Sequence, residues 1–459
     1  MKNFTFLFAG LFLSMASFAQ THEITELWDH SIQSSAVWDD VEEEWTGGAA
    51  PEWMGGTTER GLAHFDGKLY VPSRKDGNQI LVLDATSGLL IESETITLAA
   101  EEVFGGTLPI NSIAVTQSGK FIISNLAANT QSVDVETELP NGMYKAYMVD
   151  PTDNNKVTKL FEWHNVGDEV YPGFRLGDGM NFYGDIADGQ TGYLITGTAA
   201  NRYILRWDFV NGVVADEPVI IELLDVVPAP VEGAAISLGI APQYWPIDEN
   251  SFMVDGHSTV PMVFDMTGNM LASFTGPVGP TQPGVSGGAY FEFKGKHYVV
   301  APSTNHVGEP KNSFQAFEIV DGDFEAAVSL GVLPELGMGS VSNTSYINPV
   351  VVDVQSDQVL FYVMFANNGI AGYRLTYDPG TSIITPESNS TAVLFPSPAT
   401  DVVNFSVRMT SVEIYNIAGQ LVKSAADVDA VNVADLKGIY LVKGVDVHGL
   451  RLAKKLVVR

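Results

Sequence analysis

The sequence predicts an all-β protein: a six-bladed β-propeller closed by an N-terminal strand, followed by a small Ig-like β-sandwich. Composition is the first observation. Of 459 residues, 44 are glycine and 23 proline, and charged residues make up only 17%, which is typical of a globular chain of short strands and tight turns. The second observation is a repeat of four short apolar runs, separated by turn residues, between residues 61 and 377. Four antiparallel strands in succession make one propeller blade.

The first repeat shows the pattern clearly. Its apolar runs lie at 61–65, 68–72, 79–84 and 89–93, with Asp-Gly and Thr-Ser-Gly turns between them. Five further repeats follow with variable loops, and each contains an apolar run that predicts its second strand. These runs are 121–123, 192–195, 251–254, 297–300 and 359–362. A pair of irregular β-sandwiches or an open β-solenoid stays an alternative, because the repeats are counted in a single sequence.

The sixth repeat lacks a fourth strand after residues 372–375. The N-terminal run 24–30 resembles residues 157–164, which are the predicted outer strand of the second repeat. We therefore expect residues 23–30 to lie beside 370–377 and to complete the last blade, which closes the ring and protects its sheet edges.

Residues 1–19 have the three parts of a signal peptide: a basic start at Lys2, an apolar run at 4–13, and small residues at Ser17 and Ala19. A membrane anchor is the alternative. The run is shorter than the roughly 18 apolar residues that a spanning helix needs, and no later stretch reaches that length. The predicted parts are a signal peptide, a propeller, a linker and a C-terminal domain, at 1–19, 20–378, 379–392 and 393–459.

Charge and cysteine content exclude several classes of function. The chain has no cysteine, which excludes disulfides, thiolate metal sites and a lipid anchor on cysteine. The net charge is −31. From Val393 onward 8 basic and 6 acidic residues give +2, which leaves 16 basic against 49 acidic residues, or −33, in the rest. The region before Val393 is acidic enough to repel nucleic acid and anionic membrane surfaces. The change in net charge at Val393 also marks a domain boundary.

The segment after the linker carries a family resemblance. Its motifs are the proline-rich turn 395–398, the alternating run 402–407, the runs 412–422 and 431–443, and a basic, apolar end at 454–459. It resembles the type A sorting domain of the type IX (Por) secretion system, which is found in the Bacteroidota. A departure is Ser397, where the family usually has Asn. The resemblance implies that the type IX machinery carries the protein from the periplasm across the outer membrane, for release or attachment at the cell surface. A small accessory binding domain is the alternative.

The central region resembles, more loosely, secreted Bacteroidota propellers that accompany such sorting domains, which implies no activity. In a propeller, the segments leading into the blades and the loops between second and third strands share one face, around the channel mouth. We expect the ligand site on this face. Its candidate ligand-binding residues are Glu59, Arg60, Arg74, Asn125, Asp178, Asn181, Asp185, Asn201, His257, Asn305, His306 and Asn368. Ordinary turn chemistry is the alternative for each.

Oxygen donors among these segments suit a hard cation. Glu59, Asn111 and Asp185 are the candidate ligands, and calcium is the candidate ion. The histidines lack close ligand spacing, so zinc is not indicated. The acidic stretch from Trp38 to Trp45 suits either sugar stacking or calcium, or it is a solvated loop whose tryptophans pack on the first blade.

Two functions follow. The leading one is a secreted binding propeller for a glycan or another surface polymer. The alternative is a metal-assisted hydrolase or lyase with its site at the channel mouth. Carboxylates and amides aimed at one point would favour the enzyme, whereas an open aromatic platform would favour the binding protein. Catalytic triads are not indicated, because scattered Ser, His and Asp residues are expected by chance in a chain of this length.

Overall fold

The computed structural model divides the chain into two compact units, His22–Tyr377 and Asp378–Arg459. The residues that the structure describes are 21–40, 42, 44–99, 105–167, 175–226, 237–257, 259–274, 286–303, 312–342, 345–378, 392–416, 419–448 and 451–459. The predicted signal peptide and nearly all of the predicted linker lie outside these ranges, as do Asn305 and His306.

Strands dominate both units, so the all-β prediction is confirmed. The described helices are α1 (Ile32–Ser35) and the 3-10 turns η1 (Glu92–Glu94) and η2 (Pro151–Asp153). Within the described ranges, no helix has the length and apolar character needed to cross a membrane.

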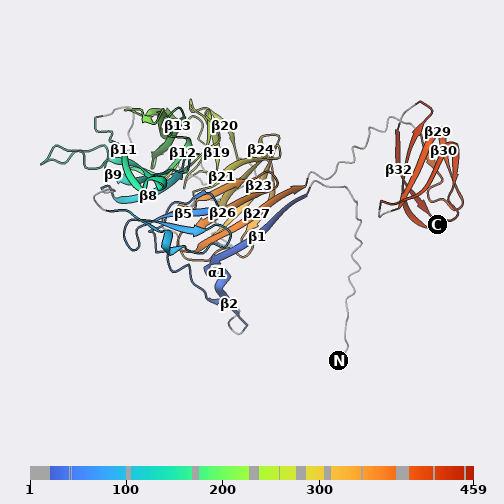
Figure 1. Ribbon diagram of the computed structural model, residues 1–459, viewed down its shortest axis with the longest axis horizontal. Coiled ribbons are helices and arrows are strands. Elements are labelled where there is room, and N and C mark those ends of the chain that lie inside the picture. The colour runs from blue at the N-terminus through green and yellow to red at the C-terminus, as the bar shows by residue number, and fades with distance from the viewer. Residues whose placement is uncertain are drawn as a thin grey trace. The chain divides into compact units, whose positions relative to one another are not determined.

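The described residues of the first unit form four four-stranded antiparallel sheets, one nine-stranded sheet and a separate two-stranded hairpin. Figure 1 shows how these strands are arranged. One four-stranded sheet consists of β4 (Ala63–Phe65), β5 (Lys68–Ser73), β6 (Gln79–Asp84) and β7 (Ile96–Thr97). The second consists of β17 (Gln243–Pro246), β18 (Ser251–Asp255), β19 (Met262–Asp265) and β20 (Met270–Ser273). The third consists of β21 (Ala289–Phe293), β22 (Lys296–Ser303), β23 (Ser313–Val320) and β24 (Asp323–Leu333). The fourth has the order β1 (Thr21–Ser31), β27 (Gly369–Asp378), β26 (Val359–Phe365) and β25 (Val350–Val354).

The nine-stranded sheet consists of two consecutive groups. The first is β8 (Leu108–Val115), β9 (Phe121–Ala128), β10 (Tyr144–Asp150) and β11 (Lys156–Trp163). The second is β12 (Arg175–Gly184), β13 (Thr191–Thr198), β14 (Tyr203–Val210), β15 (Val213–Val214) and β16 (Val219–Glu222). They join where β9 pairs with β12, at Ala127 and Ala128. The hairpin is β2 (Ala36–Asp39) and β3 (Glu44–Gly47).

All five predicted second-strand runs lie in strands, β9, β13, β18, β22 and β26. Their central residues are buried on both faces, which explains why they are continuous apolar runs rather than alternating ones. The predicted fourth strand of the first repeat, 89–93, is wrong. Leu90 makes one isolated bridge to Leu83, η1 follows, and β7 pairs with β6 instead.

The predicted pairing of the N-terminal strand is confirmed, because β1 lies beside β27 at the edge of the fourth sheet (Figure 1). Trp28 on β1 donates its indole N–H to the carbonyl of Ala85 at 3.0 Å, and its ring stacks on Tyr362. Near the start of β1, the His22 ring stacks on Tyr377 and its Nε2 lies 3.0 Å from the Tyr298 hydroxyl. The strand therefore links the last sheet to the sheets before and after it.

Each sheet shares a hydrophobic core with the next one along the chain. Ile80 and Ile123 belong to one cluster, which joins the sheet of β4–β7 to the first group of the nine-stranded sheet. Further clusters continue through the later sheets. The last one joins Tyr362 and Ile370 to Leu69 and Leu83, so the first and last sheets also share a core. Face-to-face packing of twisted sheets gives cores of this kind.

The second unit is one five-stranded sheet with its own core. Its strands are β28 (Leu394–Phe395), β29 (Val402–Asn416), β30 (Leu421–Asn432), β31 (Gly438–Asp446) and β32 (Arg451–Val458). The runs predicted at 402–407 and from 412 onward form a single strand, β29, up to Asn416. Its core includes Val403, Ile414 and Leu456, and every member lies between residues 392 and 458.

Candidate functional site

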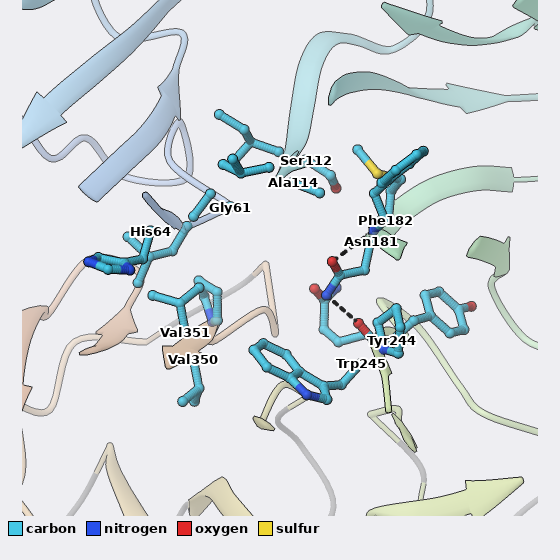
Figure 2. Close-up of a pocket in the computed structure, with 18 of the residues that line it drawn as sticks. Gly61, His64, Ser112, Ala114, Asn181, Phe182, Tyr244, Trp245, Val350 and Val351 are labelled. Atoms are coloured by element: carbon cyan, nitrogen blue, oxygen red, sulfur yellow. Dashed lines mark hydrogen bonds between the residues drawn. The ribbon is translucent and has the colours of Figure 1, made fainter. Parts of the chain in front are cut away.

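A cavity of about 530 Å³ lies where the first strands of successive sheets come together. Strands β4, β8, β12, β17 and β25 contribute to its wall, together with Gly287 and Gly288 just before β21. Figure 2 shows His64 and Val351 on one side of the cavity and Asn181 and Phe182 on the other, with Trp245 between them. Six parts of the chain that are far apart in sequence thus line one space.

The wall combines hydrogen-bonding groups with aromatic rings. The polar side chains are those of Arg60, His64, Ser112, Gln117, Asn181 and Gln243, and the aromatic ones are Phe182, Tyr183, Tyr244 and Trp245. Among the described residues that line the cavity, none is an Asp or a Glu. The groups on offer are therefore amides, a hydroxyl, an imidazole, a guanidinium and rings.

At the buried end of the cavity, Asp178 bonds two of the lining residues, Arg60 and Gln243. Its Oδ1 accepts a hydrogen bond from Arg60 Nη2 at 3.1 Å and also one from Arg175. Its main-chain carbonyl accepts from Asn111 Nδ2 at 3.1 Å and from Gln243 Nε2 at 3.3 Å. Arg60 and Asp178 expose only 6% and 1% of their side chains. Burial lowers the pKa of the Arg60 guanidinium, which stays charged at any physiological pH.

The other end of the cavity is open. Along each first strand the exposure rises from the Asp178 end: Arg60 and Ser112 are buried, whereas His64 and Val115 are half-buried and Gln117 is exposed. Access is therefore from the end where each first strand turns into its second.

Trp245 and His64 both lie toward this open part of the wall. Trp245 is half-buried and packs against the cores on both of its sides. His64 stacks on Tyr362 with ring centroids 5.5 Å apart. Burial lowers the pKa of His64, and the charges of Asp353 and Asp66 act in the opposite direction. Its imidazole is therefore neutral at pH 7 and can both donate and accept.

Several predicted site residues are engaged in holding neighbouring loops. The Glu59 carboxylate accepts from Gly55 N at 2.6 Å and from Ser73 Oγ at 2.5 Å. Arg74 donates to the Ile110 carbonyl, and Asn125 donates to the Met143 carbonyl. Asn181 does line the cavity, but its amide bonds the Tyr244 carbonyl and the Phe182 N–H (Figure 2).

The remaining predicted residues lie apart from the cavity. The Asn201 side chain accepts from Tyr203 N, Asn368 bonds both main-chain groups of Val341, and His257 packs edge-on against Tyr346. These contacts are ordinary loop chemistry. Among the described candidates, Arg60 and Asn181 line the cavity, Asp178 bonds both Arg60 and Asn111, and Asn201, His257 and Asn368 lie elsewhere.

The structure does not bring the three candidate calcium ligands together. Asn111 bonds the carbonyl of Asp178 near the start of β12, whereas Asp185 follows the end of that strand and accepts from Ser118 Oγ at 2.8 Å. In the described part of the chain, no group of three His, Asp or Glu side chains is placed to hold a metal ion.

Trp38 and Trp45 face each other across the β2–β3 hairpin, with centroids 5.5 Å apart. Each is 44% exposed, so they pack on one another rather than on the first sheet, whereas Trp53 packs against the core beneath.

Sequence reasoning missed His64, Gln243 and Trp245, because it looked for the site in loops. All three lie on first strands, and the signal that could have found them is that the first strands of a propeller line its channel.

Comparison with known proteins gives one family match, to the secretion system C-terminal sorting domain (Por_Secre_tail) over residues 393–459. The search of curated proteins found no match. Among solved structures, a DUF4623 family protein from Bacteroides eggerthii is 12% identical with a TM-score of 0.53, and the match covers 80% of this chain and 84% of that one. It shows a shared fold alone.

Two further solved structures match at lower TM-scores. One is a gluconolactonase from Xanthomonas campestris, 12% identical, with a TM-score of 0.35 and coverage of 71% of this chain and 88% of that one. The other is a lectin from Aleuria aurantia, 12% identical, with a TM-score of 0.36 and coverage of 66% and 88%.

The family match agrees with the motifs at 395–398 and 454–459, and its bounds are those expected from the sequence. Residues 393–459 are a type IX secretion system C-terminal sorting domain, and the chain is one of the proteins that this system exports to the cell surface or the extracellular space.

Proposed function

We propose that residues 20–378 form a six-bladed β-propeller that binds the end of a glycan or of another surface polymer in its central channel. The sheets starting with β4, β17 and β21, the two groups of the nine-stranded sheet, and the sheet that β1 completes are the six blades in this proposal. We also propose that the sorting domain, residues 393–459, is an Ig-like β-sandwich. The ring of blades is supported by the hydrophobic cores, because each sheet shares one with the next and the last sheet shares one with the first.

The cavity wall is the observation that carries the binding function. Sugars present hydroxyl groups and apolar C–H faces, and they are bound by amides, imidazoles and aromatic rings. The wall offers Gln243 beside Asp178, and His64 and Trp245 at the open part of the cavity, for these roles. A metal-assisted reaction would instead need oxygen ligands that converge on one point. The chemistry of the wall therefore favours binding.

The test is a glycan array probed with the exported protein, followed by calorimetric titration of each hit. Trp245→Ala should weaken binding by roughly tenfold or more, because aromatic residues in the centre of a binding site dominate its affinity. Trp38→Ala on the exposed hairpin is the matched control and should leave the affinity unchanged. If Trp38→Ala weakened binding and Trp245→Ala did not, the ligand site would lie on the hairpin, which would contradict the proposal. Product formation that a chelator abolishes would support the enzyme instead.

A further inference from the structure

We propose that the ligand of this cavity carries a carboxylate, as an acidic sugar does, and that Arg60 binds this group at the closed end. The inference rests on the proposed function, and it specifies the chemical class of the ligand for the same cavity.

The first argument is the charge of the cavity. The protein as a whole carries a net charge of −31, and an anion approaching it is repelled. Arg60 is the one side chain of fixed charge among the described residues of the cavity wall. Asp178, the ion-pair partner of Arg60, is not among the residues that line the cavity, so the charged group on the wall is a cation, which suits a ligand with a negative group.

The second argument is the balance of charge around Arg60. Arg175 donates to the same carboxylate oxygen of Asp178 that Arg60 uses. Arg74 is also near: burial lowers its pKa to about 10, and the charge of Arg60 is the next cause. Glu59 supplies a second carboxylate to this group. Among the described residues, this group therefore has three guanidinium groups and two carboxylates.

The third argument is the set of hydrogen-bonding atoms left unused at the closed end. Arg60 Nε and Arg175 Nε are buried donors without a partner in the described part of the chain. Asn111 Oδ1 and Asp178 Oδ2 are buried acceptors in the same condition. Leaving such atoms unpaired costs free energy.

A sugar acid has both kinds of group that these atoms lack. Its carboxylate binds a guanidinium through two charge-assisted bonds, and the hydroxyls beside it donate to amide and carboxylate oxygens. A neutral sugar supplies the hydroxyls only. The remaining rings of an acidic oligosaccharide would extend past Trp245 toward the open end.

Calorimetric titration of the full exported chain tests this with two ligands: a disaccharide of uronic acids, and the same disaccharide after reduction of its carboxyl groups to alcohols. The acid should bind at least about tenfold more tightly, since hydrogen bonds to charged groups are the strong ones. Arg60→Gln should remove this preference. Arg206→Gln is the matched control, because it removes a guanidinium on β14 that pairs with Asp208 outside the cavity.

Each outcome decides the matter. Equal affinity for the two disaccharides overturns the inference and leaves the proposed function in place. Binding of neither disaccharide, nor of any glycan on the array, overturns both. Binding of a peptide through its terminal carboxylate, without binding of the sugars, also overturns the inference. If Arg60→Gln fails to fold, as judged by circular dichroism, the comparison of the two disaccharides on the unaltered chain decides alone.

Discussion

Arg60 and Asp178 lie 118 positions apart in the sequence and form a buried ion pair, with Nη2 and Oδ1 separated by 3.1 Å. The pair joins the segment leading into β4 to β12, across one end of the cavity. The main-chain carbonyl of Asp178 also accepts hydrogen bonds from the side-chain amides of Asn111 and Gln243, so one residue holds together parts of four strand groups. The ion pair thus lies at the buried end of the cavity, away from the more exposed ends of the first strands.

Replacement of Asp178 tests its structural role. Asp178→Asn should lower the free energy of unfolding by about 3–5 kcal/mol, because it leaves two guanidinium groups without their shared carboxylate in a buried place. Urea denaturation followed by fluorescence measures the change. Glu94→Gln, which removes the exposed ion pair with Lys68, is the control and should cost less than about 1 kcal/mol. Equal effects of the two substitutions would contradict the role given to Asp178.

Trp28 tests the contribution of the N-terminal strand. Its ring is 9% exposed and packs in the core between the first and last sheets. Trp28→Ala should destabilise the first unit by about 3–5 kcal/mol through the cavity it leaves. Leu27→Ala, on the same strand but 38% exposed, should have little effect. Thermal denaturation compares them, and a melting temperature unchanged by Trp28→Ala would show that β1 adds little to stability.

Asp29 predicts a dependence of stability on pH. Burial raises its pKa from 3.8 to about 6, with hydrogen bonds from Ser31 as the largest opposing effect. Between about pH 4 and pH 6 the native state therefore holds a proton that the unfolded chain has lost, so stability falls as pH rises through this window.

The variant Asp29→Asn is neutral throughout and should lose this fall, so that it is more stable than the unaltered chain at pH 7 and similar at pH 4. Denaturation midpoints at several pH values measure the difference. Asp321→Asn, on an exposed turn, serves as the control. Parallel curves for Asp29→Asn and the unaltered chain would show that this carboxyl does not titrate in the window.

Much of the fold could be predicted because its signals are local. The run 251–254 is four apolar or small residues after an Asp-Glu-Asn turn, and it forms β18 with every residue buried. The run 89–93 has the same appearance, yet Glu92 begins a 3-10 turn and Ile96 pairs with Ile80 instead. A short apolar run shows that a segment is buried, but tertiary pairing decides which residues become the strand.

The candidate site could be predicted only in part, because its contacts join distant segments. Arg60 and Asp178 were expected near the ligand as polar residues of the segments that lead into predicted blades, but their ion pair leaves no local pattern in the sequence. In the sequence, Trp245 cannot be told from other aromatic residues in strands. Only the position of β17 beside the cavity identifies it as a lining residue. Residue type identified polar groups, and only the three-dimensional arrangement separates those that hold loops from those that line the cavity.

The last prediction concerns the role of the sorting domain in export. Its hydrophobic core lies wholly between residues 392 and 458, and the first unit has cores of its own. A chain that ends at Tyr377 should therefore fold but stay in the periplasm, because it lacks the domain that marks proteins for export by the type IX system. Cell fractionation measures its location, and circular dichroism its folding.

The point variant Ile414→Asp separates loss of the domain's fold from loss of its sequence. Ile414 is fully buried, and an unpaired carboxylate in its place should unfold the sorting domain while the first unit keeps its structure. This variant should be retained in the periplasm like the shortened chain, whereas Glu413→Gln, at a surface position on the same strand, should be exported normally. Export of Ile414→Asp at the normal level would show that the machinery reads a linear signal near the C-terminus rather than the folded sheet.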